Sequence, residues 1–264
     1  MNVAETHVAV NGHDCRVWRA GSGPRVGFLA GFGGLPKWHP FLDTLAGHFE
    51  VVAPSIPGFP GATGHHDFDT HTDWILAIRD LHDGAGLLGG SGGAALVGSG
   101  PGAAMAADIA AFWPEKVSRL ALISPWGLFD EADPMGDPWA RHKPALAGFL
   151  CADPQRWNDL VATPADADPV EWPIVQARAL EASARIFWPL GNTGVAKRLG
   201  RIACPTLLLR GDADRVIPAS YMNAFADGVA GEARIEAVAG AGHLAELDQP
   251  DAVAAAIGDF LAAG

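Results

Sequence analysis

Two glycine-rich stretches carry serines in a setting that suits nucleophilic catalysis. Residues 89–93 (GGSGG) contain Ser91, and residues 98–102 (GSGPG) contain Ser99. A serine at the tip of a sharp strand–turn–helix connection is exposed for attack on a carbonyl carbon. Such a connection requires a buried strand directly before the turn and an uninterrupted helix directly after it, and this requirement separates the two stretches.

Ser91 lacks the neighbours that this connection needs. Only Gly86-Leu87-Leu88 precedes it as an apolar run, and the sequence after it, Ala94–Val97, is typical of a strand. The second stretch fits better, because that strand leads into the turn and a helix over Ala103–Trp113 follows. Pro101 then lies in the first turn of the helix, where a missing N–H costs least. We therefore expect Ser91 to lie in a loop.

The second stretch also satisfies a dinucleotide-binding pattern. Gly98, Gly100 and Ala103 match G-x-G-x-x-G/A between a strand and a helix. That fingerprint needs an acidic residue about 20 positions further on, at the end of the next strand. The next strand, Leu120–Ser124, is followed by Pro125 and carries no carboxylate. The pattern therefore disfavours an oxidoreductase, and we predict no cofactor.

A histidine-rich segment is a candidate for metal binding. Residues 65–71 (HHDFDTH) hold three histidines and two aspartates, and both residue types are common zinc ligands. The segment is polar and overlaps Thr70-x-x-Asp73, the pattern of a helix capping box. We predict a solvated loop before a helix, and no metal site. Cys15, Cys151 and Cys204 lie far apart, so we expect core packing rather than a disulfide or zinc framework.

Short apolar runs alternate with longer amphipathic stretches along most of the chain. Runs of Val, Leu and Ile without polar alternation are typical of strands covered on both faces. Strands that alternate with helices indicate an α/β fold with a mostly parallel, doubly wound sheet. The predicted strands are Arg25–Ala30, Phe49–Ala53, Ala94–Gly98, Arg119–Ser124 and Thr206–Arg210, and the predicted helices are Trp38–Gly47, Asp73–His82, Pro101–Trp113, Ala219–Val229 and Pro250–Ala262.

Two regions depart from this rhythm. Val8–Trp18 contains an Asn-Gly pair between two short runs, which predicts an antiparallel hairpin. From Gly127 to about Arg198 there is no strong strand, and a helix is predicted over Pro173–Trp188. The tryptophans of this segment either pack as ordinary helical core or form an apolar lid over a ligand cavity. They are Trp139, Trp157, Trp172 and Trp188, with Trp126 just before the segment.

Composition limits the partners of the protein. The chain has 264 residues, enough for one full-sized core, with 49% hydrophobic and 18% charged residues and a formal net charge of −12. The acidic balance disfavours nucleic acid and anionic membrane surfaces as partners. The first residues resemble no signal peptide, and no run of about 18 apolar residues predicts a membrane span. We expect a cytoplasmic protein with a small-molecule substrate or ligand; the oligomeric state is not indicated.

Three motifs, taken in order, resemble those of the α/β-hydrolase superfamily. Residues 30–34 (AGFGG) are similar to its oxyanion loop, residues 211–218 (GDADRVIP) to its acid loop, and residues 240–244 (GAGHL) to its histidine loop. The resemblance implies a core formed by residues 1–126 and 199–264, with a helical cap over 127–198. It also assigns Asp214 and His243 as a catalytic acid–histidine dyad and the Phe32 N–H as an oxyanion donor.

The nucleophile position departs from the family pattern. In that family a Tyr-Pro-Glu-x-Val stretch follows the nucleophile at a typical spacing, and the similar stretch here, Trp113–Val117, places that position at Gly100. Pro101, the next residue, lacks the N–H that normally completes the oxyanion hole. Loss of one such donor costs about 2.7–4 kcal/mol of transition-state stabilisation. We expect Gly31, Gly33, Ser99 and Trp126 to line the substrate site.

Three functions remain open. The first is an enzyme in which the dyad acts as general base on a small, largely apolar carbonyl or ester-like compound, including lyase or C–C bond hydrolase chemistry. The second is a ligand-binding descendant without catalysis. The third is an ordinary serine esterase that uses Ser91 or Ser99.

Overall fold

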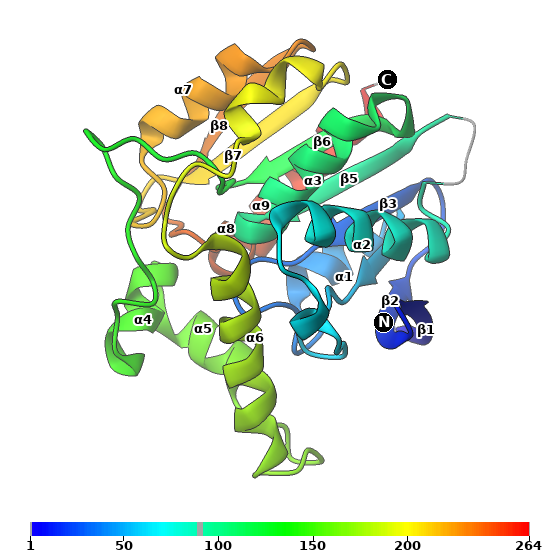
Figure 1. The fold of residues 1–264 in the computed structure, drawn as a ribbon, viewed down its shortest axis with the longest axis vertical. Helices are drawn as coiled ribbons and strands as arrows, with labels where there is room; N and C mark the ends of the chain where they lie inside the picture. The colour runs from blue at the N-terminus through cyan, green and yellow to red at the C-terminus, as the bar shows by residue number, and fades with distance from the viewer. Residues whose placement is uncertain (1, 89–91, 264) are drawn as a thin grey trace.

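An eight-stranded sheet runs through the molecule, with helices on both faces (Figure 1). The computed structural model describes residues 2–88 and 92–263. The strand order is β1-β2-β4-β3-β5-β6-β7-β8; β1 pairs with β2, and β2 with β4, antiparallel, and the other pairs are parallel. This is the predicted mostly parallel, doubly wound α/β sheet.

The strand bounds follow the buried apolar runs. Five of the strands match the predicted ones to within about two residues, the error typical of strand ends. The strands are β1 (Ala4–Val10), β2 (His13–Ala20), β3 (Arg25–Leu29), β4 (Glu50–Pro54), β5 (Ala94–Ser99), β6 (Val117–Ile123), β7 (Thr206–Gly211) and β8 (Ala233–Val238).

Helices fill two apolar layers, one on each face of the sheet. One core lies between the sheet and α2, α3 and α7, and the other between the sheet and α1 and α9. The α-helices are α1 (Pro40–Ala46), α2 (His71–Gly84), α3 (Gly100–Phe112), α4 (Lys143–Leu150), α5 (Pro154–Val161), α6 (Glu171–Phe187), α7 (Ala219–Gly228), α8 (Ala245–Asp248) and α9 (Pro250–Ala262). Short 3₁₀ turns are η1 (His65–Asp67), η2 (Pro114–Lys116), η3 (Val195–Lys197) and η4 (Leu199–Arg201).

Local sequence signals explain several of these boundaries. Asn11 and Gly12 both have positive φ, at 50° and 79°, which is the two-residue hairpin turn predicted between β1 and β2. Thr70 caps α2, and the side chains of Thr70 and Asp73 form the predicted capping box. Because these signals act within a few residues, they place elements without reference to the rest of the fold.

The prediction of a solvated loop before α2 is wrong in part. His66, Asp67 and Asp69 are exposed, but His65 and Phe68 are buried within η1 and directly after it. The cause is tertiary, because α6, which lies more than 100 residues later in the chain, packs onto this segment. The three cysteines are free and buried, as predicted; burial raises the pKa of the Cys15 thiol to about 12.

The segment between β6 and β7 contains α4, α5 and α6, which Figure 1 shows grouped apart from the helices that flank the sheet. The predicted helix over Pro173–Trp188 corresponds to α6, which starts two residues earlier. We call residues 127–198 the insertion. No helix in the described part of the chain combines the length and the apolar character that a membrane span needs.

Candidate active site

A sharp strand–turn–helix connection joins β5 to α3. Ser99 is the last residue of β5, and Gly100 begins α3 with a φ of +47°. An added Cβ at Gly98 would lie 2.6 Å from the Cα of Ala103. An added Cβ at Gly102 would collide with the carbonyl oxygen of Leu29. A side chain at either glycine would collide with backbone, so both glycines let the helix pack directly against the strands. Position 100 lies between them, at the tip of the turn.

A buried carboxylate–imidazole pair lies at the ends of the neighbouring strands. Asp214 follows β7, His243 follows β8, and Asp214 Oδ2 lies 3.2 Å from His243 Nδ1. The other oxygen, Asp214 Oδ1, accepts hydrogen bonds from the N–H groups of Val216 (2.8 Å) and Ile217 (3.0 Å). Burial raises the pKa of the Asp214 carboxyl. The charge and hydrogen bond of His243, together with these two N–H groups, lower the pKa by more than burial raises it. The pKa therefore lies below its usual value.

The pair faces the tip of the turn. A Cβ added at Gly100 would lie 3.1 Å from His243 Nε2 and 3.3 Å from Trp126 Nε1. A side chain at position 100 would thus meet the nitrogen that accepts a proton in an acid–histidine–nucleophile arrangement. The three elements that the sequence singled out, the β5–α3 turn and the loops after β7 and β8, converge here.

Trp126 is hydrogen-bonded to Nε2 of His243, the ring nitrogen to which a nucleophile at position 100 would give its proton. Its indole Nε1 donates a hydrogen bond to His243 Nε2, at 2.9 Å. An indole N–H can only donate, so Nε2 must be the unprotonated acceptor and the proton of a neutral His243 must sit on Nδ1, facing Asp214. Both ring nitrogens are therefore engaged, and His243 and Trp126 are fully buried.

Aromatic side chains cover this site. Phe32 stacks on Trp126 at a centroid distance of 5.9 Å, and Trp139 packs edge-on against both at 5.5 Å. Trp157 of α5 lies 6.2 Å from Phe32, and Phe187 of α6 lies 5.4 Å from Trp126. The insertion thus supplies the aromatic groups that close the site.

Two of the predicted tryptophans lie elsewhere. The indole of Trp172 donates to the carbonyl of Val161 at 2.8 Å, within the insertion, and Trp188 is 57% exposed. These two tryptophans are not among the aromatic side chains that cover His243, so only part of the tryptophan-rich segment contributes to the site.

The loop after β3 lies beside the turn. Gly33 has a φ of +83°, and a Cβ there would lie 2.7 Å from the ring of Trp157. A Cβ at Gly31 would lie 2.8 Å from Ser99 Oγ. Ser99 is therefore packed beneath this loop and fully buried, whereas Ser91 lies outside the described residues. Pro101 is in the first turn of α3 and offers no N–H.

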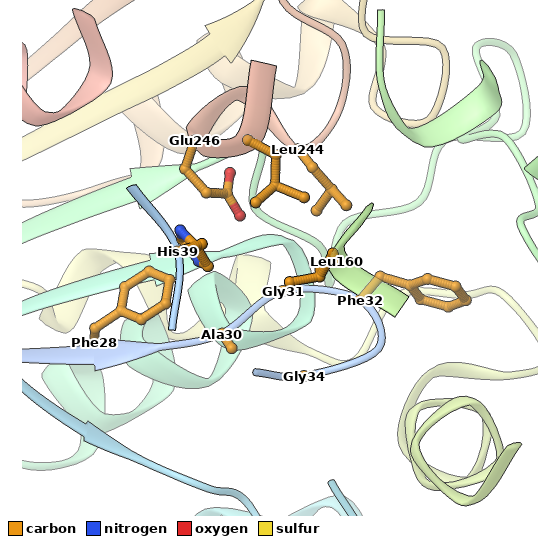
Figure 2. Close-up of a pocket in the computed structure, with 10 residues that line it drawn as sticks. Phe28, Ala30, Gly31, Phe32, Gly34, His39, Leu160, Leu244 and Glu246 are labelled. Carbon is orange, nitrogen blue, oxygen red and sulfur yellow. The ribbon is translucent and has the colours of Figure 1, made fainter. Parts of the chain in front are cut away.

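A second buried polar cluster, which the sequence did not suggest, lies behind the same loop (Figure 2). His39 and Glu246 line a cavity of about 10 Å³, room for about one water molecule. Within the described residues, His39 Nδ1, Ser99 Oγ and Glu246 Oε2 have no hydrogen-bond partner. Burial raises the pKa of Glu246 to about 6 and lowers that of His39 to about 4, because a buried site disfavours the charged form of each group.

Asp248 is a positioning residue that motif matching missed. Its Oδ2 accepts from the N–H groups of Gly242 and Ala152, each at 2.8 Å, and its Oδ1 from that of Asp153 at 3.1 Å. One buried carboxylate thereby ties the His243 loop to the start of α5 in the insertion. The signal available in the sequence was only its spacing, five residues after His243.

Comparison with known proteins agrees with this architecture. A family model described as the alpha/beta hydrolase family matches residues 11–256. The chain belongs to this family. The α/β-hydrolase resemblance of the three loops is therefore confirmed at the level of family and fold, while the roles of the individual site residues rest on the geometry described above.

Two relatives are similar in sequence to most of this chain. The chain is 27% identical over 257 residues to the dihydrolipoyllysine-residue acetyltransferase component of the acetoin cleaving system of Cupriavidus necator, covering 91% of this hydrolase-family chain but only 64% of that relative. It is 24% identical over 273 residues to 2-hydroxy-6-oxo-6-(2'-aminophenyl)hexa-2,4-dienoic acid hydrolase of Metapseudomonas resinovorans, covering 97% of the chain and 90% of the relative.

Solved structures show the same fold. A bacterial membrane phospholipase A superposes with a TM-score of 0.77 at 24% identity, covering 98% of this chain and 86% of that one. The 2-hydroxy-6-oxo-6-phenylhexa-2,4-dienoate hydrolase of Rhodococcus sp. strain RHA1 superposes with a TM-score of 0.76 at 21% identity, covering 99% of both chains. At these identities the likeness establishes the fold alone.

Proposed function

We propose that this α/β-hydrolase is an enzyme that hydrolyses a small, largely apolar carbonyl compound by general-base catalysis, without a serine nucleophile. The observation that carries the proposal is the arrangement at the turn: His243 and Asp214 form a buried pair, and His243 Nε2 faces Gly100, which has no side chain. A pair with this geometry retains the means to accept a proton, whereas the position of the attacking group is left to a water molecule.

Water performs the attack in this proposal. His243 Nε2 takes a proton from the water as the water oxygen bonds to the carbonyl carbon, and Asp214 stabilises the imidazolium that forms. The bond between the carbonyl carbon and the leaving group then breaks, and the leaving group takes the proton from Nε2. The products are a carboxylic acid and, for a ketone, a C–H compound or, for an ester, an alcohol.

Trp126 has two roles in the proposed reaction. In the structure its N–H blocks Nε2 of His243, so the base becomes free only when this hydrogen bond is exchanged. We place the indole N–H on the carbonyl oxygen of the bound substrate, beside the N–H of Phe32. That exchange frees the base and supplies the second oxyanion donor that Pro101 lacks.

The substrate class follows from the surroundings. Phe32, Trp139, Trp157 and Phe187 offer apolar and aromatic surface around the dyad, and the insertion acts as a cap that moves to admit the substrate. One relative and one structural neighbour carry names of hydrolases for 2-hydroxy-6-oxo-hexadienoates with an aryl group. We therefore favour aryl ketones and dienoates of this kind, with C–C bond cleavage, as the first substrates to test.

The test is a turnover assay on the full chain with an aryl 2-hydroxy-6-oxo-dienoate and with p-nitrophenyl esters of short acids. We expect turnover that requires His243 and produces no acyl-enzyme in rapid-quench mass spectrometry. Accumulation of a covalent adduct on Ser91 or Ser99 would instead support a serine esterase. Turnover that His243→Ala leaves unchanged would contradict the proposal.

A second candidate, a ligand-binding protein without catalysis, is favoured by one observation. His243 is fully buried, and both of its ring nitrogens are hydrogen-bonded. A histidine with only a structural role would have the same burial and the same bonds. In that case no substrate of the panel is turned over, and an aromatic carboxylate or ketone binds with an affinity that His243→Ala changes only modestly.

A further inference from the structure

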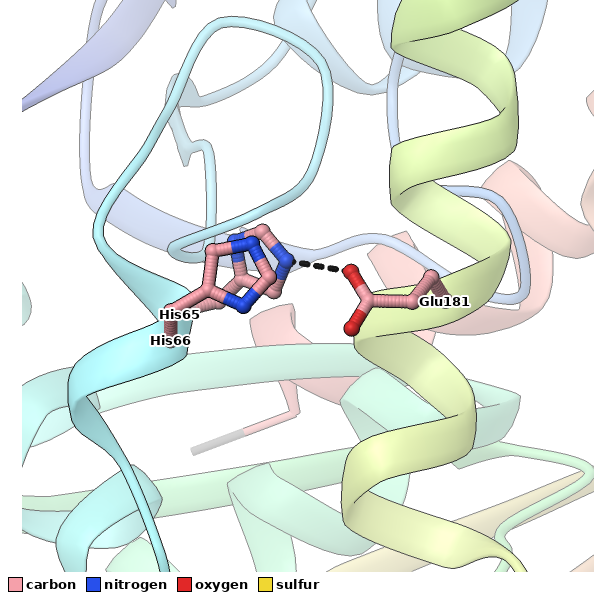
Figure 3. Close-up of side chains that lie close together, drawn as sticks. All are labelled: His65, His66 and Glu181. Carbon is pink, nitrogen blue, oxygen red and sulfur yellow. Dashed lines mark hydrogen bonds and ion pairs between the residues drawn. The ribbon is translucent and has the colours of Figure 1, made fainter.

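A cluster of two histidines and one glutamate lies away from the dyad, where the insertion meets the core (Figure 3). His65 and His66 belong to η1, between β4 and α2, and Glu181 belongs to α6. His65 Nε2 lies 2.5 Å from Glu181 Oε2, and the rings of His65 and His66 are 3.9 Å apart at an interplanar angle of 37°. One donor atom from each residue lies within 4.8 Å of the other two.

Contrary to the expectation from the sequence, we propose that His65, His66 and Glu181 form a binding site for a divalent transition-metal ion of the Zn²⁺ type. Two neutral imidazoles and one carboxylate are a ligand set that suits zinc and its neighbours, whereas magnesium and calcium prefer oxygen ligands. Zinc binds nitrogen and oxygen at about 2.0–2.2 Å, so its donors stand roughly 3.3 Å apart.

The cluster needs only small movements to reach that spacing. The His65–Glu181 separation must open by somewhat less than about 1 Å, and His66 must move inward by roughly 1.5 Å at most. His66 is exposed and the Glu181 side chain is 42% exposed, so both can adjust and water can take the fourth position. His65 is held in place, with 1% of its surface exposed.

Close backbone packing brings the three side chains together. A Cβ added at Gly58 would lie 2.6 Å from the ring of His65 and 2.7 Å from the Cβ of Ala182, the residue after Glu181. The glycine thus lets α6 approach η1 closely enough for Glu181 to reach His65. The site is built by the packing of the insertion on the core and not by a flexible surface loop alone.

Neighbouring charged side chains contact Glu181 and Asp67 without occupying Glu181 Oε2, the oxygen that faces His65. Arg185 lies 3.7 Å from Glu181 Oε1, the oxygen that faces away from His65, and orients the carboxylate. Asp67 is engaged by His13 at 2.8 Å and therefore stays out of the coordination sphere. Bound metal would bridge η1 and α6, which fixes the insertion to the core at a point separate from His243.

The test is titration of the full chain with zinc chloride by isothermal calorimetry, together with the visible absorption of a cobalt(II)-loaded sample. We expect one zinc per chain and the cobalt bands of a four-coordinate site with nitrogen ligands. His66→Ala and Glu181→Gln, both at exposed positions, should each weaken binding at least tenfold. His7→Ala is the matched control, because His7 is also an exposed histidine beside carboxylates, Glu5 and Asp14; it should change nothing.

Two outcomes would overturn the site. One is the absence of stoichiometric zinc binding by a folded wild-type protein. The other is binding that His66→Ala and Glu181→Gln leave unchanged, which would mean adventitious binding at other surface histidines. Far-UV circular dichroism of each variant confirms that weaker binding does not arise from unfolding. Because turnover is not used as a readout, the result is independent of the proposed hydrolase function.

Discussion

The two halves of the site differ in what they retain. In the acid–base half, Asp214 and His243 are buried, bonded to each other and supported by backbone N–H groups. In the turn half, Gly100 stands at the tip of a sharp strand–turn–helix connection with a φ of +47°, but it has no side chain, and Pro101 has no N–H. In the proposed function, this strand–turn–helix connection therefore serves a water molecule and not a nucleophilic side chain at position 100.

The backbone of the turn and the groups that covalent catalysis would need depend on different residues. Backbone geometry at the turn depends on close packing at Gly98 and Gly102, where an added Cβ would lie 2.6 Å and 2.4 Å from the nearest backbone atom. Nucleophilic catalysis depends on one side chain and one N–H. With glycine at position 100 and proline at position 101, covalent catalysis at this turn would lack both groups, while the Asp214–His243 pair is in place.

The largest expected effect concerns the acid–base half. On any carbonyl substrate that the protein turns over, His243→Ala should abolish activity and Asp214→Asn should lower kcat about 10⁴-fold, because the amide holds the wrong tautomer. Steady-state kinetics measures both, and unchanged thermal unfolding controls for folding. If Asp214→Asn retained nearly full activity, the two residues would not act as a pair.

The next effect tests how the two halves communicate through Trp126. Trp126→Phe keeps the aromatic packing but removes the N–H that contacts His243 Nε2. We expect kcat to fall about 10²-fold, the magnitude of one lost oxyanion donor. Trp139→Phe is the matched control, because its indole N–H donates to the carbonyl of Leu180 and not to the dyad. A rise in kcat in Trp126→Phe would show that the indole only blocks the base.

The frame of the turn can be tested by stability. Gly102→Ala should destabilise the protein by about 2–3 kcal/mol, because the new methyl group meets the backbone carbonyls of Leu29 and Ala30. Gly258→Ala in α9 is the control: its nearest neighbour, Phe49, is 3.9 Å away, and replacing a helical glycine there should stabilise by about 0.5–1 kcal/mol. Urea unfolding measures both. Equal effects would mean that α3 does not pack closely on β3.

The smallest effect concerns Glu246, which lies behind the loop after β3. Its pKa is about 6 in the folded protein against an ordinary 4.5, so the folded state holds the proton more tightly and stability falls as the pH rises from about 4.5 to 6. The loss is about 2 kcal/mol and persists at higher pH. Glu246→Gln should remove this loss in urea unfolding at several pH values, whereas Glu115→Gln at an exposed position should not. Parallel pH curves for wild type and Glu246→Gln would contradict it.

Much of the fold was predictable because its signals are local. The apolar runs of β3 to β7, the Asn-Gly hairpin and the capping box of α2 act within a few residues. β8 was missed because it is an edge strand whose Arg234, Ile235 and Glu236 face outward or lie half-exposed. Its composition therefore lacks the buried apolar run by which the other strands were recognised.

The site was predictable where motifs carry backbone requirements, and not where side chains meet across the fold. Asp214, His243 and the turn at Gly100 were expected from the resemblance of their loops to the α/β-hydrolase pattern. The hydrogen bond from Trp126 to His243, the burial of His65 and the cluster of His39, Ser99 and Glu246 depend on tertiary packing of segments far apart in the chain. Such contacts leave no pattern in a single sequence.

The central claim, that position 100 is the nucleophile position and is not used by a side chain, can be tested without knowing the substrate. Wild type, Gly100→Ser and Gly100→Ala are each incubated with a fluorophosphonate, and intact and peptide masses are measured beside a serine hydrolase control. We predict that wild type and Gly100→Ala stay unlabelled and that Gly100→Ser gains one adduct at position 100. Labelling of wild type at Ser91 or Ser99, or a folded Gly100→Ser variant without an adduct, would contradict the account.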